Sequence, residues 1–175
     1  MSIAQLPIQV DPRRLAEQNV ILEGEVTVAE LERLADRLFD NAGTVWAKFD
    51  FGRDPGGCNT INAHIKAKLV LQCQRCMQPM AYTVDTHFVL SPIAKEEEAD
   101  NLAADYEPLP LPAGDLVSLL VLIEDELLLS VPIVPKHDTA ACKVKLADVN
   151  QADDAEERVE EKPNPFAVLK QLKKK

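Results

Sequence analysis

The chain has 175 residues, 46% of them hydrophobic and only 5% aromatic, so it can bury one aliphatic core of single-domain size. Its net charge of −10 excludes binding to nucleic acid by bulk charge alone. Four cysteines are too few for a disulfide scaffold, the N-terminus lacks a signal-peptide pattern, and the longest apolar run, residues 116–123, is too short to cross a bilayer. We therefore expect a soluble cytoplasmic protein with reduced thiols.

The negative charge is unevenly distributed along the chain. Residues 1–91 carry 9 basic and 11 acidic side chains, residues 92–162 carry 6 and 18, and residues 163–175 carry 4 and none. The acidic side chains concentrate around residues 95–107 and 148–161. Such a chain can bind RNA through a local basic face, or a basic protein through its acidic segments.

The first third of the chain predicts two strands with a helix between them. Residues 19–26 have a short strand pattern. Thr27 and Glu30 have the spacing of a capping box, and apolar residues recur at helical spacing up to Asp40. Residues 44–51 then alternate as a second strand, and a glycine-rich turn follows.

The clearest pattern is a long hairpin. Apolar and polar residues alternate with period two over residues 61–72, as in a half-buried antiparallel strand. Residues 80–90 return with the same alternation, their apolar side chains directed inward. The turn between the two strands, residues 73–79, carries Cys73-Gln74-Arg75-Cys76 at its tip.

The rest of the chain predicts one helix flanked by acidic segments. Residues 92–112 are acidic and proline-rich, which indicates a loop. Residues 116–129, capped by Asp115, are apolar almost all round, which favours a buried helix. Residues 148–162 have the composition of a disordered acidic linker, and residues 163–175 form a basic tail.

These elements predict an α+β fold for residues 1–147. We expect an antiparallel sheet of about four to six strands, including the long hairpin, packed against the buried apolar helix.

Two short clusters contain residues that commonly bind metals. Cys73 and Cys76 lie at the hairpin tip, and His137 and Cys142 follow the helix. Together they can form a tetrahedral zinc site that fastens one segment to the other. The alternative is reduced thiols that pack as small apolar groups, which is also the expectation for an isolated, buried Cys58. A redox pair is disfavoured because the motif lies between strands and not at a helix N-terminus.

Basic side chains gather on the outward face of the hairpin and at the C-terminus. They are predicted to contact RNA phosphates: His64, Lys66, Lys68, Arg75, Lys173, Lys174 and Lys175. From the pattern alone, a solvated strand face, which often carries lysine, is the favoured explanation of the hairpin residues. The tail also carries a predicted partner-docking motif: Asn164, Pro165, Phe166, Leu169 and Leu172. A helix that caps its own domain is the alternative for this motif.

No constellation of residues indicates catalysis. The sequence has no nucleophile with a paired base and no phosphate-binding glycine loop. The Glu124-Asp125-Glu126 triplet is the only candidate for a nuclease metal site, but successive helical side chains point about 100° apart. We therefore expect a polar stripe that faces solvent or a basic partner, in a protein that is not an enzyme.

Several of these stretches together resemble the bacterial large ribosomal RNA subunit accumulation protein family, YceD. The resemblance is carried, in order along almost the whole chain, by residues 6–13, 71–80, 106–108, 122–138, Cys142 and residues 162–172. The most specific parts are the C-Q-R-C turn, the E-D-E-L helix and the N-P-F-A-V-L tail.

The resemblance implies a non-enzymatic ribosome biogenesis factor needed for accumulation of large-subunit (23S) ribosomal RNA, with no catalytic residues to transfer. Combined with the charge pattern, it suggests that the hairpin face binds a precursor RNA or particle and that the acidic segments contact a basic ribosomal protein. The alternatives are an acidic escort for a free ribosomal protein, a processing nuclease or a thiol redox protein.

Overall fold

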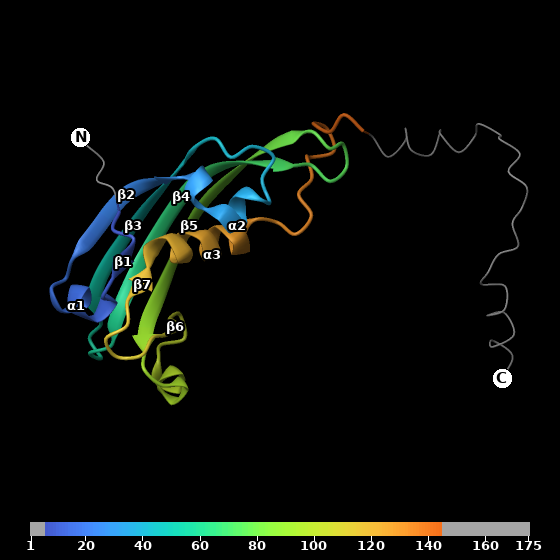
Figure 1. The fold of residues 1–175 in the computed structure, drawn as a ribbon. Coiled ribbons are helices and arrows are strands. Elements are labelled where there is room, and N and C mark those ends of the chain that lie inside the picture. The colour runs from blue at the N-terminus through green and yellow to red at the C-terminus, as the bar shows by residue number, and fades with distance from the viewer. Residues whose placement is uncertain (1–5, 145–175) are drawn as a thin grey trace, which may run out of the picture.

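The computed structural model describes residues 6–144 and confirms the α+β class (Figure 1). A long curved sheet carries short helices on one face, and a small ribbon lies at one end. In chain order the elements are β1 (Gln9–Val10), α1 (Pro12–Glu17), β2 (Ile21–Thr27), the 3₁₀ helix η1 (Val28–Glu30), α2 (Glu32–Ala35), β3 (Thr44–Arg53), β4 (Asn59–Gln72), β5 (Pro79–Ile93), the 3₁₀ helix η2 (Glu96–Asn101), β6 (Glu107–Pro110), β7 (Val117–Ser118) and α3 (Leu119–Ser130).

The main sheet has the strand order β2-β3-β4-β5-β6. Neighbours are antiparallel except β5 and β6, which run parallel. β4 and β5 pair continuously from Ile61 opposite Leu90 to Gln72 opposite Pro79, and residues 73–78 connect them. The predicted pairing of residues 61–72 with 80–90 is therefore present. β1 pairs antiparallel with β7 as a separate two-stranded ribbon.

The core lies on one face of the sheet, as the period-two pattern predicts. Its largest side chains are almost completely buried: Phe49, Phe51, Ile61, Ile65, Leu69, Leu71, Leu119, Ile123 and Leu127. Figure 1 shows α2 and α3 lying across this face, and Ala16 of α1 joins the same core cluster. Apolar burial on this face is the main stabilising contribution to the fold.

The predicted helix over residues 27–40 is wrong in its second half. The structure has η1 and the short α2, and the chain then leaves the helix at Asp36. Phe39 donates its N–H to the Val70 carbonyl at 2.7 Å, and Asp40 forms a bridge with Val70. β4 continues beyond Ala67, where its pairing with β3 ends. Residues 39–40 pair with Val70 on the edge of β4 that β3 leaves uncovered. This tertiary hydrogen bonding overrides the helical propensity.

The predicted loop over residues 92–112 is also wrong, because it contains η2 and β6. β6 pairs in register with β5 from Leu90 opposite Glu107 to Ile93 opposite Pro110. Prolines are tolerated here because β6 is an edge strand, where one row of N–H groups needs no partner.

The long apolar helix begins later and is less buried than predicted. Ser118, not Asp115, caps α3 by accepting a hydrogen bond from the Val121 N–H. One side of α3 packs into the core, but Leu129 on the other side is 81% exposed. Val131 and Pro132 end the helix as expected. No helix within residues 6–144 is long and apolar enough to span a membrane.

Candidate functional site

The turn between β4 and β5 has the local geometry of a thiolate-binding turn. The Cys73 N–H donates to the Gln78 carbonyl at 3.0 Å, and the Met77 N–H donates to the Cys73 carbonyl at 2.8 Å. Met77 has a φ of 56°, a left-handed conformation that reverses the chain. The N–H groups of Arg75 and Cys76 act on the Cys73 sulfur by lowering the pKa of its thiol. The turn therefore presents both cysteines on one side.

The segment after α3 is fastened to this turn by its backbone. Gln74 donates its N–H to the Pro135 carbonyl at 2.8 Å, and the Arg75 guanidinium donates to the His137 carbonyl at 2.9 Å. The Asp138 carbonyl accepts the Cys142 N–H at 3.0 Å, closing a turn that brings Cys142 back beside His137. Both ligand-bearing segments are thus held in place by main-chain hydrogen bonds.

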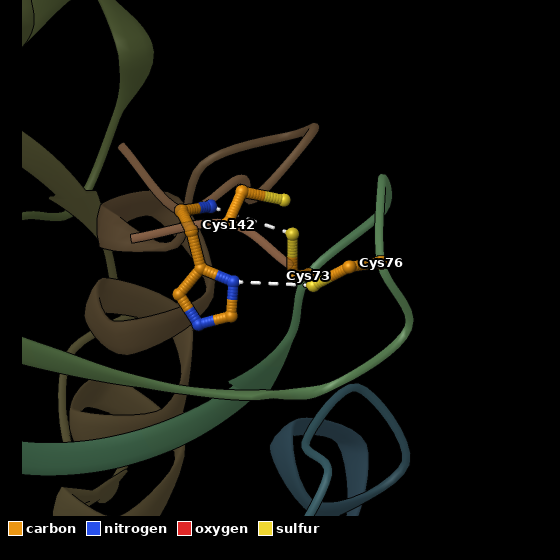
Figure 2. A group of neighbouring side chains, drawn as sticks. Cys73, Cys76 and Cys142 are labelled. Carbon is orange, nitrogen blue, oxygen red and sulfur yellow. Dashed lines mark hydrogen bonds between the residues drawn. The ribbon is translucent and has the colours of Figure 1, made fainter. Parts of the chain in front are cut away.

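The two predicted half-sites converge on one centre, which we call the clasp: Cys73, Cys76, His137 and Cys142. One ligand atom from each residue lies within 4.8 Å of all the others. Figure 2 shows the sulfur atoms of Cys73, Cys76 and Cys142 directed toward one another from the two segments. The Cys76 Sγ and the His137 Nδ1 are 3.4 Å apart, and the His137 N–H donates to the Cys73 Sγ at 3.4 Å.

The surroundings of the clasp act differently on its side chains: they lower the pKa of the Cys73 thiol, whereas the hydrogen bond with Cys76 raises the pKa of His137. The His137 Nε2 lies 3.1 Å from the Pro79 carbonyl, a contact that orients the ring and directs Nδ1 at the sulfur atoms. Burial opposes ionisation of Cys73, but N–H groups of His137, Cys76 and Arg75 outweigh it and lower its pKa to about 5. Burial raises the pKa of Cys142. Three sulfur ligands with one imidazole form a closed set of the kind found in structural zinc sites.

The predicted RNA-contacting residues do not all share one surface. His64, Lys66 and Lys68 lie on the outward face of β4, away from the core. The His64 Nε2 is 2.7 Å from the Asp85 Oδ1, and the Lys66 Nζ is 3.4 Å from the Asp85 Oδ2. The hydrogen bond from His64, followed by that from Lys66, lowers the pKa of Asp85. Arg75 lies instead in the turn beside the clasp, where its guanidinium donates to the His137 carbonyl.

The outward face also holds aromatic residues that sequence reasoning did not assign to a site. Trp46 lies opposite Lys66 across β3 and β4, and His87 lies opposite His64 across β4 and β5. Lys48 lies opposite His64 on β3, so Lys48, His64 and His87 are neighbours across three strands. Only the strand register, which the sequence pattern leaves open, could have brought these residues together.

The expectation that the Glu124–Glu126 triplet faces solvent or a basic partner is wrong for Glu124. This residue is 7% exposed and reaches back to α2. Its Oε2 accepts from the Arg33 Nε at 2.6 Å, and its Oε1 accepts the N–H groups of Arg33 and Leu34 at 2.7 and 3.2 Å. Burial raises its pKa, but these bonds outweigh burial, so the net pKa is lowered.

The other two carboxylates of the triplet have separate partners. Asp125 lies 2.8 Å from a terminal nitrogen of Arg33, and Glu126 accepts from the Thr86 hydroxyl at 2.7 Å. The triplet thus connects α3 to α2 and to β5.

Cys58, expected to be buried, is half-buried beside the turn at Asp54. The tail lysines and the docking motif of residues 164–172 lie outside the described residues.

Comparison with known proteins gives two concordant findings. The sequence profile of a family described as "Large ribosomal RNA subunit accumulation protein YceD" matches residues 61–173, which include both halves of the clasp. A protein with that name from Haemophilus influenzae is 33% identical over 175 residues, covering 100% of both chains. No solved structure matches the chain.

Proposed function

Because the chain belongs to the large ribosomal RNA subunit accumulation protein YceD family, we propose that it is a non-catalytic factor on which accumulation of large-subunit ribosomal RNA depends. It acts by binding a precursor RNA or an immature large-subunit particle. The observation that supports binding is the outward face of β3, β4 and β5. That face presents lysines and aromatic rings to solvent, while the opposite face is filled by the core.

A non-catalytic role agrees with how the acidic triplet is used. A nuclease that depends on divalent metal needs carboxylates that converge on one ion. Here Glu124 and Asp125 bind Arg33, and Glu126 accepts from Thr86. These contacts make the triplet part of the scaffold, so we expect purified protein to show no magnesium-dependent cutting of precursor RNA.

Sedimentation with ribosomal particles at two salt concentrations tests the proposal. The tagged protein should migrate with immature large subunits and not with finished ribosomes. Reversing the charge of Lys66 and Lys68 to Glu should weaken this association, because both side chains are exposed on the outward face. The matched control reverses two exposed lysines elsewhere, Lys95 and Lys136, and changes the net charge equally.

If the protein remains at the top of the gradient at low salt, direct particle binding is refuted. An escort for a free basic ribosomal protein then becomes the better hypothesis. Exposed carboxylates at Glu96 and Glu97 in η2 supply a suitable acidic surface for it. The docking motif of the tail, including Phe166 and Leu169, remains a prediction. The domain bounds at residues 147 and 162 also remain predictions. Deleting the motif should reduce co-sedimentation with the particle only if the motif docks on that particle.

The clasp supports a second proposal, one structural zinc ion held by Cys73, Cys76, His137 and Cys142. A redox pair needs only the two cysteines of the turn. The convergence of a buried third thiol and an imidazole is better explained by tetrahedral metal binding. The ion would hold the β4–β5 tip against the segment after α3.

Elemental analysis of protein purified without chelator tests this assignment. We expect about one zinc per chain, as for a site whose ligands are brought together by folding. Cys142→Ser should lose the metal, while Cys58→Ser, which changes a thiol outside the clasp, should retain it. Folded wild-type protein with far less zinc would refute the site. A disulfide between Cys73 and Cys76 together with insulin reduction would favour redox chemistry.

A further inference from the structure

Three aromatic side chains from three adjacent strands contact one another on the outward face of the sheet. The rings of His64 and His87 stack with centroids 3.5 Å apart and planes inclined by 25°. The Trp46 ring meets His64 edge-on, with centroids 5.1 Å apart. We call this group the aromatic row. Because it lies on the face opposite the core, the hydrophobic core does not account for it.

The indole of Trp46 is held in a defined orientation. Its Nε1 donates to the Glu23 Oε1 at 3.1 Å, and the Lys66 Nζ lies 5.9 Å from the ring centroid, within cation–π distance. A half-buried tryptophan whose ring is already fixed by neighbours loses little conformational freedom when another flat ring stacks on it. This is the preorganisation that aromatic binding surfaces rely on.

A groove of about 440 Å³ runs beside this indole. This volume lies in the range of about 300–1,000 Å³ typical of ligand sites. The groove is bordered by Trp46, Lys66, Lys68, Thr83 and Asp85, among others. It thus combines one aromatic wall with two ammonium groups, a hydroxyl and a carboxylate. That combination suits a nucleotide, whose base stacks, whose base edge hydrogen-bonds and whose phosphate needs a cation.

The charge on this face selects between paired and unpaired RNA. Three lysines on β3 and β4, Lys48, Lys66 and Lys68, face four carboxylates on the same side of the sheet: Glu23, Glu25, Asp50 and Asp85. A duplex presents mainly phosphates and is bound by a surplus of positive charge, which this face lacks. Unpaired bases can instead stack on aromatic rings, a contact that does not depend on net charge.

We propose that the outward face of β3, β4 and β5 is a base-stacking site for single-stranded RNA, centred on Trp46 and the groove beside it. This inference rests on the proposed function, and it specifies which form of RNA the chain contacts and which side chain stacks. The lysines beside the groove contact the phosphates adjoining the stacked base. Because few phosphates are engaged, affinity should fall only slightly as salt rises.

The chain contains a single tryptophan, so its fluorescence reports on the proposed contact directly. The purified full-length protein is titrated with an unlabelled single-stranded RNA of about ten nucleotides, within the site sizes of single-strand binders. We expect saturable quenching of Trp46 fluorescence. The same strand annealed to its complement should quench far less at equal concentration.

Variants separate stacking from simple stability effects. Fluorescence anisotropy with labelled RNA should show an affinity loss of about tenfold or more for Trp46→Ala, the size expected for one stacked base. Trp46→Phe should retain most of the affinity because it keeps an aromatic face. Leu129→Ala, which removes an exposed apolar side chain on α3, is the matched control and should bind as wild type.

The outcomes distinguish this inference from the proposed function. Unchanged Trp46 fluorescence on RNA binding, or equal affinity for duplex and single strand, would overturn the stacking site. If Trp46→Ala does not fold, the wild-type quenching and the Trp46→Phe variant still decide the question. If the wild type binds no RNA but sediments with particles, the stacking site alone is wrong. If it does neither, the proposed function is wrong as well.

Discussion

Replacing Glu124 by Gln should measurably destabilise the fold at neutral pH. The glutamine keeps the size of the side chain and an acceptor for the N–H groups of Arg33 and Leu34. It loses the negative charge, and its amide group would face the Arg33 Nε, so that two donors oppose each other. The changed contact is therefore the 2.6 Å bond between the Arg33 Nε and the Glu124 Oε2.

The magnitude follows from the surroundings of this bond. A hydrogen bond to a charged group contributes about 1.5–3 kcal/mol. Because the Arg33 side chain is 53% exposed, water replaces part of the lost interaction, and we expect the low end, about 1–2 kcal/mol for Glu124→Gln. Glu124→Ala removes all three acceptor contacts and leaves buried N–H groups unpaired, so we expect about 3 kcal/mol.

Urea unfolding followed by circular dichroism measures these changes as shifts in midpoint with an unchanged slope. Asp125→Asn is the matched control. It neutralises the next residue, which contacts the same Arg33 but is 50% exposed, and should change stability much less. A loss below about 0.5 kcal/mol for Glu124→Gln would refute the role assigned to this contact, since surface substitutions alone have effects of that size.

The same contact predicts the pH dependence. The folded pKa of Glu124 lies below the unfolded value of 4.5, so its contribution to stability is fully present above pH 4.5. The contribution is lost as pH falls through the lower folded pKa. The stability difference between wild type and Glu124→Gln should therefore be constant from pH 7 to 6 and shrink below pH 4.5. A difference that grows in acid would contradict this explanation.

Three further changes probe other parts of the fold. Removing metal with a strong chelator should lower the melting temperature of wild type but not that of Cys142→Ser, as measured by calorimetry. Leu127→Ala, at a fully buried position of α3, should cost about 2–5 kcal/mol in urea unfolding, while Leu129→Ala should cost almost nothing. Thr86→Val removes the hydroxyl that donates to Glu126 and should cost about 1 kcal/mol; a larger loss would mean that this bond anchors α3 more strongly than its partial exposure suggests.

Local patterns explain which parts of the fold were predictable. The alternation over residues 61–72 identifies β4 because one face is buried along its whole length. The C-x-x-C turn predicts half of the clasp because both cysteines lie in one local structure. Asp11 followed by Pro12 is a helix-start signal that was available for α1 but not used; the Asp11 side chain accepts from two N–H groups.

The missed features depend on partners far away in sequence. The shortening of the predicted helix over residues 27–40 follows from the bond of Phe39 to Val70, which no local pattern contains. Glu124 and Arg33 are 91 residues apart, so the acidic triplet resembled a solvent-facing stripe. The prolines of β6 indicated a loop. They are permitted in this strand because it lies at the edge of the sheet, and the local sequence does not show that position.

The clasp also has a consequence for how the chain folds. It joins Cys73 and His137, which are 64 residues apart in sequence, and β5, β6, β7 and α3 all lie between them. If the zinc ion proposed for the clasp stays bound to both segments when the protein unfolds, it restricts the unfolded ensemble as a disulfide of that span would, by about 4 kcal/mol of chain entropy. The β4–β5 tip and the segment after α3 would then stay neighbours throughout refolding. A metal-loaded chain should consequently refold faster than a stripped one, even where the two native structures are the same.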